Sequence, residues 1–105
     1  MARRGEHGEI LGRCPICGRG MVGGPSVDRH HWMPKSEGGT EVAIVHLICH
    51  RMIHRTLTDR ELATGFDTAE KLRAHPEIAK FVKWVRKRPP DYVDWPRTKR
   101  AARRR

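Results

Sequence analysis

Two short stretches hold four of the seven histidines and decide the fold: Asp28-Arg29-His30-His31-Trp32-Met33-Pro34 and Cys49-His50-Arg51-Met52-Ile53-His54. Adjacent residues on a strand point to opposite faces, whereas residues four apart share one face of a helix. His50 and His54 therefore form a helical pair, and one further imidazole would complete a three-ligand metal site with open positions. An unligated histidine would remain to remove a proton from water. This set of groups favours metal-assisted hydrolysis of a phosphodiester.

The three cysteines and one more histidine form a second set of candidate metal ligands. Cys14-x-x-Cys17 and His46-x-x-Cys49 are two pairs with matching gaps, which suit tetrahedral Zn²⁺. We predict a structural zinc ion that ties an N-terminal knuckle to the start of the central helix, with a binding free energy on the order of 10 kcal/mol. Two alternatives remain open. His50 could replace His46 as the fourth ligand, or the chain could hold a reduced cysteine pair and an unrelated Cys49.

The chain is small and basic. Only 37% of its 105 residues are hydrophobic and 6% are aromatic, so its core is thin and a metal staple would compensate for this. The formal net charge of +10 favours a polyanionic partner, DNA or RNA, over the simpler interpretation of a protein with a basic tail. No signal peptide or membrane-spanning run is visible. We therefore expect a cytoplasmic protein with no membrane partner, in whose reducing surroundings paired cysteines more often bind metal.

The pattern along the chain predicts one domain over residues 13–88, between a flexible N-terminal segment (1–12) and a basic tail (89–105). The first half of this domain should contain a zinc-knuckle turn, two short strands joined by a glycine-containing loop, and a central helix. These elements are predicted over residues 14–24, 26–32, 42–45 and 46–57, in that order.

Further helix signals follow the central helix. Thr58-Asp59-Arg60-Glu61 and Asp67-Thr68-Ala69-Glu70 both have the spacing of a capping box, and the second would open a helix reaching His75. Pro76 is well placed at the start of the next helix, which Pro89-Pro90 would end.

In order along the chain, these features resemble the HNH nuclease family. The resemblance covers about residues 14–57 and is carried by Cys14-x-x-Cys17, His30-His31-x-x-Pro34, Gly38-Gly39-Thr40, Cys49-His50 and His54. It implies an α+β fold: a small zinc-stapled ββα-metal motif of two strands and a helix around one divalent ion, here followed by C-terminal helices and the basic tail. It also implies a bacterial or phage endonuclease that hydrolyses double-stranded DNA to leave a 5′-phosphate and a 3′-hydroxyl.

The resemblance assigns roles to individual histidines. His30 would ligate the catalytic ion, and His31, the second of the adjacent pair, would be the general base. His50 would be a ligand, and His54 matches a third ligand of the histidine-rich colicin-type members. An imidazole with a pKa near ~6.5 suits a general base at neutral pH. The catalytic ion could be Mg²⁺, Mn²⁺, Ni²⁺ or Zn²⁺, and three imidazoles favour the later transition metals.

One residue departs from the family's pattern. The chain has no asparagine, and the position of the family's middle Asn falls on Glu41. We expect Glu41 to brace the loop through its side chain, or to hold the second ring N–H of His31 through its backbone carbonyl. Asp28 could be a partner of the site or a solvated strand residue.

DNA contacts are expected from basic residues near these motifs and in the tail: Arg29, Lys35, Arg51, Arg55, Arg97 and Arg100. Trp95 is a further candidate for DNA contact. Two other functions remain open. The chain could be a non-cleaving, zinc-stabilised DNA-binding module, which the missing Asn favours slightly, or an assembly partner within a phage or mobile element.

Overall fold

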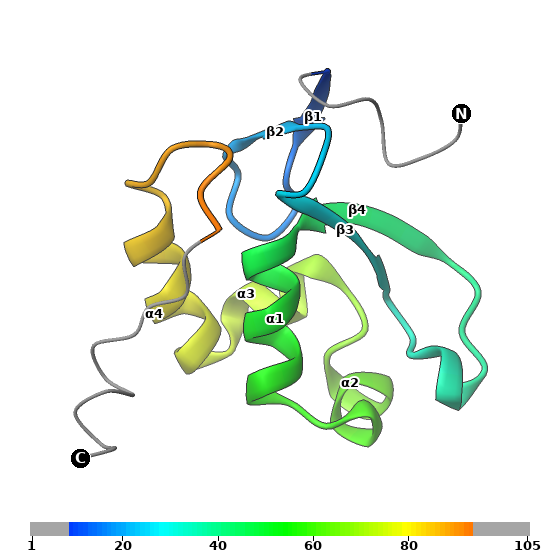
Figure 1. The fold of residues 1–105 in the computed structure, drawn as a ribbon. Coiled ribbons are helices and arrows are strands. Elements are labelled where there is room, and N and C mark those ends of the chain that lie inside the picture. Colours follow the sequence, from blue (N-terminus) through cyan, green and yellow to red (C-terminus); the bar gives the residue numbers. More distant parts are fainter. Residues whose placement is uncertain (1–8, 94–105) are drawn as a thin grey trace, which may run out of the picture.

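The computed structural model describes residues 9–93, which form a small α+β protein with two antiparallel hairpins and four α-helices (Figure 1). The first hairpin pairs β1 (Ile10–Arg13) with β2 (Gly20–Val22). The turn between them is closed by a hydrogen bond of 2.8 Å from the Gly18 N–H to the Cys14 carbonyl. Gly18 has a φ of 81°, which glycine adopts without steric cost. This turn confirms the predicted knuckle.

The flexible segment expected over residues 1–12 is wrong at its C-terminal end. Ile10 and Gly12 pair with Val22 and Met21 across the hairpin. The knuckle turn brings β2 back alongside these residues, so their backbone groups form a ladder that their polar, glycine-rich sequence does not indicate.

The second hairpin confirms both predicted strands to within a residue at each end. β3 (Val27–His31) pairs with β4 (Val42–His46), with Val27 opposite His46 and His31 opposite Val42. The connecting loop contains a 3₁₀ turn, η1 (Lys35–Glu37). Gly39 in this loop lies so close to the Met33 carbonyl that a Cβ atom would overlap it. A glycine is therefore required where the loop turns back toward β4.

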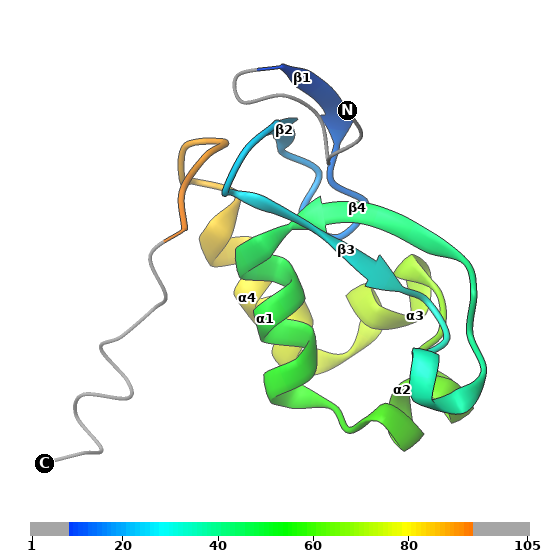
Figure 2. The same cartoon turned by 45° about the vertical axis from the view of Figure 1, so that its right-hand side comes forward.

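The central helix α1 (Leu47–Thr56) follows β4 without a break and buries Ile48, Cys49 and Ile53. It packs against β3, β4 and α4. Turned by 45°, the molecule shows the β3–β4 hairpin arching over α1 and the η1 turn lying beside α2 (Figure 2). The two strands and α1 thus form a ββα unit.

Three further helices complete the described fold: α2 (Asp59–Gly65), α3 (Ala69–Ala74) and α4 (Pro76–Val85). The capping box at the start of α2 is confirmed, because Thr58 and Glu61 exchange side chain–backbone hydrogen bonds of 3.1 and 2.8 Å. The helices bury Leu62, Leu72, Ile78 and Val85 in a core shared with the first residues of α1.

The second predicted capping box is wrong. Thr68, not Asp67, is the N-cap of α3, and its hydroxyl oxygen accepts from the Lys71 N–H at 3.1 Å. Because the residue three positions after Thr68 is a lysine, no carboxylate is available to complete the box. Asp67 instead binds the Lys71 ammonium at 3.0 Å.

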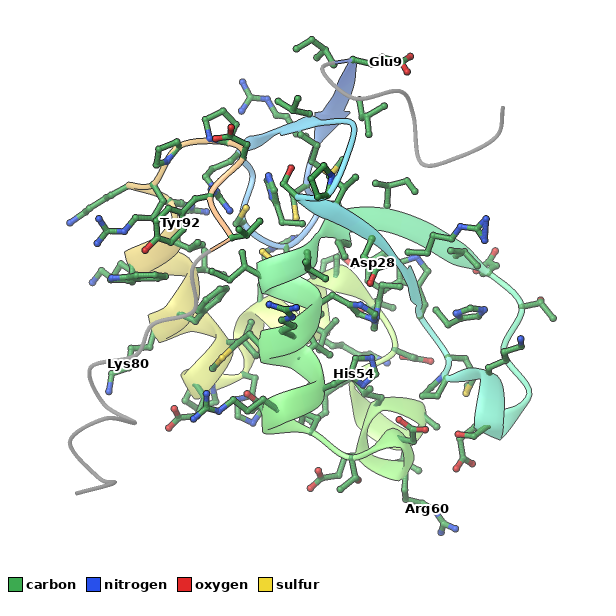
Figure 3. All side chains as sticks on the ribbon, in the orientation of Figure 1. Glu9, Asp28, His54, Arg60, Lys80 and Tyr92 are labelled. Atoms are coloured by element: carbon green, nitrogen blue, oxygen red, sulfur yellow. The ribbon has the colours of Figure 1, made fainter. Side chains whose placement is uncertain are left out.

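Residues 89–93, here called the arm, are the described part of the predicted basic tail, and they are docked on the domain. The guanidinium of Arg19 donates to the carbonyls of Arg88 and Pro89. The Tyr92 ring lies edge-on to Trp84, with ring centres 5.8 Å apart. Figure 3 shows Tyr92 beside α4. The rest of the predicted tail, with Trp95, Arg97 and Arg100, lies outside the described residues. None of the helices within residues 9–93 is long and apolar enough to cross a membrane.

Candidate metal centres

Four ligand residues meet where the first hairpin contacts the start of α1, and we call them the cysteine cluster: Cys14, Cys17, His46 and Cys49. All four are buried, and their ligand atoms lie within 4.8 Å of one another. The Cys14 and Cys49 sulfurs are 3.9 Å apart, and the Cys17 sulfur is 3.3 Å from Nδ1 of His46. Tetrahedral Zn²⁺ with Zn–S bonds of about 2.3 Å would separate two sulfurs by about 3.8 Å. The group could hold a metal ion and is compatible with zinc.

His46, and not His50, completes the cysteine cluster, which resolves the choice that the sequence left open. Its Nε2 lies 2.8 Å from the Pro90 carbonyl and 3.1 Å from the Gly20 carbonyl. A carbonyl can only accept a hydrogen bond, so Nε2 carries the proton and donates it. Nδ1, which lies 3.3 Å from the Cys17 sulfur, is then the ring nitrogen that would bind a cation. The arm thus helps to fix the ring in the form that binds a cation.

The electrostatics of the cysteine cluster favour a thiolate at Cys17. Hydrogen bonds from the Cys14 and Cys49 thiols hold the pKa of Cys17 far below its usual value. Arg19 adds to this, because its Nε donates to the Cys17 sulfur at 3.3 Å. The pKa of Cys49 is raised by its hydrogen bonds to Cys14 and Cys17. Protons are therefore shared among the sulfurs of the cluster. A divalent cation bound there would replace these protons.

Three histidines form a second group, here called the histidine site: His30 on β3, and His50 and His54 on α1. Their ligand atoms also lie within 4.8 Å of one another. The Nε2 atoms of His50 and His54 are 3.1 Å apart, as expected for residues one helical turn apart. The His30 ring centre lies 5.3 Å from that of His50 and 5.8 Å from that of His54.

His30 gives the strongest indication that the histidine site holds a ligand. Its side chain is fully buried, yet neither ring nitrogen has a hydrogen-bond partner. Leaving such groups unpaired costs about 1–3 kcal/mol, so a native structure rarely does so without a reason. Burial, followed by the charges of His50 and His54, lowers the pKa of His30 to about 4. The imidazole is therefore neutral near pH 7, the state that ligates a cation.

Two carboxylates lie behind the α1 histidines. Asp28 binds Nδ1 of His50 through Oδ2 at 3.2 Å, so it is a partner of the site rather than a solvated strand residue. Asp59, which the sequence analysis did not connect to the site, has Oδ1 3.9 Å from Nδ1 of His54. Figure 3 shows Asp28 and His54 in the region between α1 and the β3–β4 hairpin. In each case the carboxylate faces Nδ1, whereas Nε2 of the same ring faces the other histidine of α1.

The two remaining candidate catalytic residues are His31, the last residue of β3, and Glu41, which directly precedes β4. His31 is half-buried and, by strand alternation, faces away from His30. Glu41 has an exposed side chain, and its carbonyl accepts from the Trp32 N–H at 3.2 Å. Within residues 9–93 no hydrogen bond joins the Glu41 carboxylate to the His31 ring. That carbonyl has a second lone pair, so it could also accept from an imidazole N–H.

The described basic residues that were predicted to contact DNA lie on three different elements. Arg29 is exposed on β3, Lys35 on η1, and Arg51 and Arg55 on α1. Arg51 also lines a shallow cleft together with Asp91 and Val93 of the arm. Arg97 and Arg100 lie outside the described residues.

These observations define the chain as a small α+β protein in which two Cys and His groups are assembled as candidate metal centres. The chain is 44% identical, over 85 residues, to the uncharacterized protein YisB of Bacillus subtilis strain 168, in a match that covers 79% of this chain and 82% of that protein. It belongs to the same family as YisB. No family model matches the sequence, and no solved structure matches it.

Proposed function

We propose that the protein is a metal-dependent endonuclease of the HNH type that hydrolyses phosphodiester bonds of DNA. The observation that carries this proposal is the convergence of His30, His50 and His54 on one point, with both ring nitrogens of the buried His30 unpaired. The adjacent His31 faces the other side of the strand. A metal site with a free imidazole beside it has the groups that assisted hydrolysis requires.

The residues of the histidine site would act as a neutral cage for one divalent cation. When bound, that cation would supply positive charge to the scissile phosphate and to the leaving 3′-oxygen. His30 would hold it from the strand, and His50 and His54 from the helix. Asp28 would orient the His50 ring by accepting its Nδ1–H, as carboxylates do behind metal-binding histidines.

His31 would take the proton from the attacking water. It is half-buried, so one ring nitrogen can face solvent and substrate. Its other ring nitrogen needs an acceptor that fixes the tautomer, and the backbone carbonyl of Glu41 is close in the strand pairing, because the Trp32 N–H binds it. Any residue at position 41 would supply this backbone carbonyl. The proposed activity therefore does not require the Asn that the HNH family has at this position.

Plasmid cleavage tests the proposal. The purified protein, its loosely held ions removed, would be incubated with supercoiled DNA and Mg²⁺, Mn²⁺, Ni²⁺ or Zn²⁺ in separate reactions. We expect nicked or linear DNA with at least one ion. His31→Ala should lose about 10²- to 10⁴-fold in rate while still binding DNA, because a general base contributes about that much. His7→Ala serves as the control histidine variant.

The outcomes distinguish the functions that the sequence left open. DNA binding with no cleavage by any ion would favour a zinc-stabilised DNA-binding module. Absence of both DNA binding and cleavage would favour an assembly role. Cleavage by His31→Ala at the wild-type rate would show that the base is assigned wrongly.

A further inference from the structure

Asp59, the first residue of α2, lies between the histidine site and the β3–β4 loop. Its Oδ2 accepts a hydrogen bond of 2.7 Å from the Ser36 hydroxyl in η1, and its Oδ1 lies 3.9 Å from Nδ1 of His54. The neighbouring residues Thr58 and Glu61 form the capping box that fixes the start of α2. One carboxylate therefore faces both the loop and a candidate metal ligand, from a backbone that is held in place.

The orientation of the two α1 histidines suggests what Asp59 does. His50 and His54 turn Nε2 toward each other at 3.1 Å and turn Nδ1 toward a carboxylate, Asp28 and Asp59 respectively. A metal-binding histidine usually donates its second ring N–H to such an acceptor, which fixes the tautomer and makes the ring a better ligand. The structure has this hydrogen bond at His50, whereas at His54 the Asp59 carboxylate faces Nδ1 from 3.9 Å and is placed to accept its N–H after a small shift.

The Ser36 contact distinguishes Asp59 from an ordinary exposed ion-pair partner. The side chains of His54 and Asp59 are 42% and 48% exposed, and such a pair alone contributes little to stability. However, Ser36 holds the second carboxylate oxygen, and η1 packs against α2. Asp59 is thus hydrogen-bonded to the loop and faces His54 across 3.9 Å.

We propose that Asp59 is a positioning residue for His54, and that through Ser36 it couples occupation of the histidine site to the order of the β3–β4 loop. This inference rests on the metal-binding part of the proposed function and not on DNA cleavage. A cation at Nε2 of His54 makes the Nδ1–H a stronger donor, which draws in the Asp59 carboxylate. The carboxylate is bonded to Ser36, so the loop that carries Lys35 is held against α2 when the site is filled.

Two measurements test the inference on the full-length, zinc-containing protein. The first is the affinity for Ni²⁺ as the added ion, determined by calorimetry. We expect Asp59→Ala to weaken Ni²⁺ binding by about 10- to 100-fold, as loss of such a carboxylate typically does. Asp59→Asn, which keeps an acceptor oxygen without the charge, should fall in between.

The second measurement is amide hydrogen exchange of residues 35–39 with and without Ni²⁺. Wild-type protein should gain protection there when the ion is added. Ser36→Ala should retain Ni²⁺ affinity within a few-fold but lose this gain, because only the link to the loop is cut. If Asp59 only stabilised the fold, substitutions of Asp59 and Ser36 would change Ni²⁺ affinity and hydrogen exchange together.

Asp67→Ala is the control, because it removes another aspartate, 33% exposed against 48% for Asp59, which binds Lys71 beyond the other end of α2. It should change neither readout, and unchanged zinc content and melting temperature would show that each variant is folded. Wild-type affinity in Asp59→Ala would overturn the positioning role, and a Ni²⁺-induced gain in protection in Ser36→Ala would overturn the coupling. If the wild type itself binds no Ni²⁺ beyond its zinc, the histidine site fails as a metal site, and the inference falls with it.

Discussion

At the scale of single residues, His30 combines complete burial with two unpaired ring nitrogens. Such a residue reduces the stability of the metal-free site and increases the free energy gained when a cation binds. Its neighbours on α1 are far less buried and are already supported by Asp28 and Asp59. We therefore regard His30 as the candidate ligand whose environment would depend most on a bound ion.

The lowered pKa of His30 predicts a pH dependence of stability. The unfolded imidazole takes up a proton near pH 6.5, whereas the folded one stays neutral until about pH 4. Between these values the unfolded state binds more protons, so the stability conferred by His30 falls as the pH drops from 6.5 toward 4, by up to about 3 kcal/mol. Urea unfolding of the zinc-containing protein at several pH values would measure this fall. His30→Gln should show a shallower pH dependence, whereas His7→Gln should match the wild type.

The backbone carbonyl of Glu41 leads to a prediction about its side chain. If only the carbonyl matters, Glu41→Ala should keep cleavage within about tenfold of wild type, because any residue supplies that oxygen. If the carboxylate braces the loop, Glu41→Ala should be far slower. Glu41→Asn, which introduces the Asn of the HNH pattern, should then be tolerated. Cleavage rates under single-turnover conditions decide between the two. Equally severe loss in both variants would contradict either role.

At the scale of elements, the cysteine cluster joins the β1–β2 hairpin to β4 and α1. A closed set of four ligands would contribute folding free energy on the order of 10 kcal/mol. We expect Cys14→Ser and Cys49→Ser to lower the melting temperature by well over 10 °C and to reduce solubility, with loss of bound zinc measured by atomic emission. A well-folded, metal-free protein with all three thiols titratable would rule out this role.

The sequence predicts most elements of the ββα unit, because their signals are local. Residues 42–45 form a short apolar run rich in β-branched side chains, and His46 to Leu57 has helical spacing. Strand β1 was missed because its pairing depends on the turn that the cysteines close. Asp59 was recognised only as part of a capping box, since its contacts with Ser36 and His54 exist only after α2 folds back beside the loop.

At the scale of the whole molecule, the docked arm is the feature that sequence reasoning could not supply. It is held mainly through the backbone carbonyls of residues 88–90, which every residue has, by Arg19 and His46 from distant parts of the chain. The ligand sets, in contrast, were recognisable because cysteine and histidine pairs have characteristic spacings. The candidate metal ligands were therefore predictable, while the groups that would orient them were mostly not.

The basic residues beyond the arm give a prediction for the complete chain. The stretch from residue 97 to residue 105 holds six Lys and Arg and no acidic residue. Each phosphate contact contributes about −0.9 to the slope of log K against log salt concentration. Deleting residues 97–105 should therefore weaken DNA binding and flatten that slope by a few units, while leaving cleavage at saturating DNA nearly unchanged. Unchanged affinity and slope, measured by fluorescence anisotropy, would mean that the tail only aids solubility.

The hydrogen bond from His46 to the Pro90 carbonyl also has a consequence for biosynthesis. The four cluster ligands have all been translated once residue 49 is added, but the carbonyl that braces the His46 ring comes about 40 residues later. At a translation rate of about 5–20 residues per second, this interval is about 2 to 8 s. During this interval the Pro90 carbonyl does not yet exist, and of the two carbonyls that contact Nε2 of His46 only that of Gly20 has been synthesised. The arm can therefore close over the His46 ring only after every ligand of the cysteine cluster has been translated.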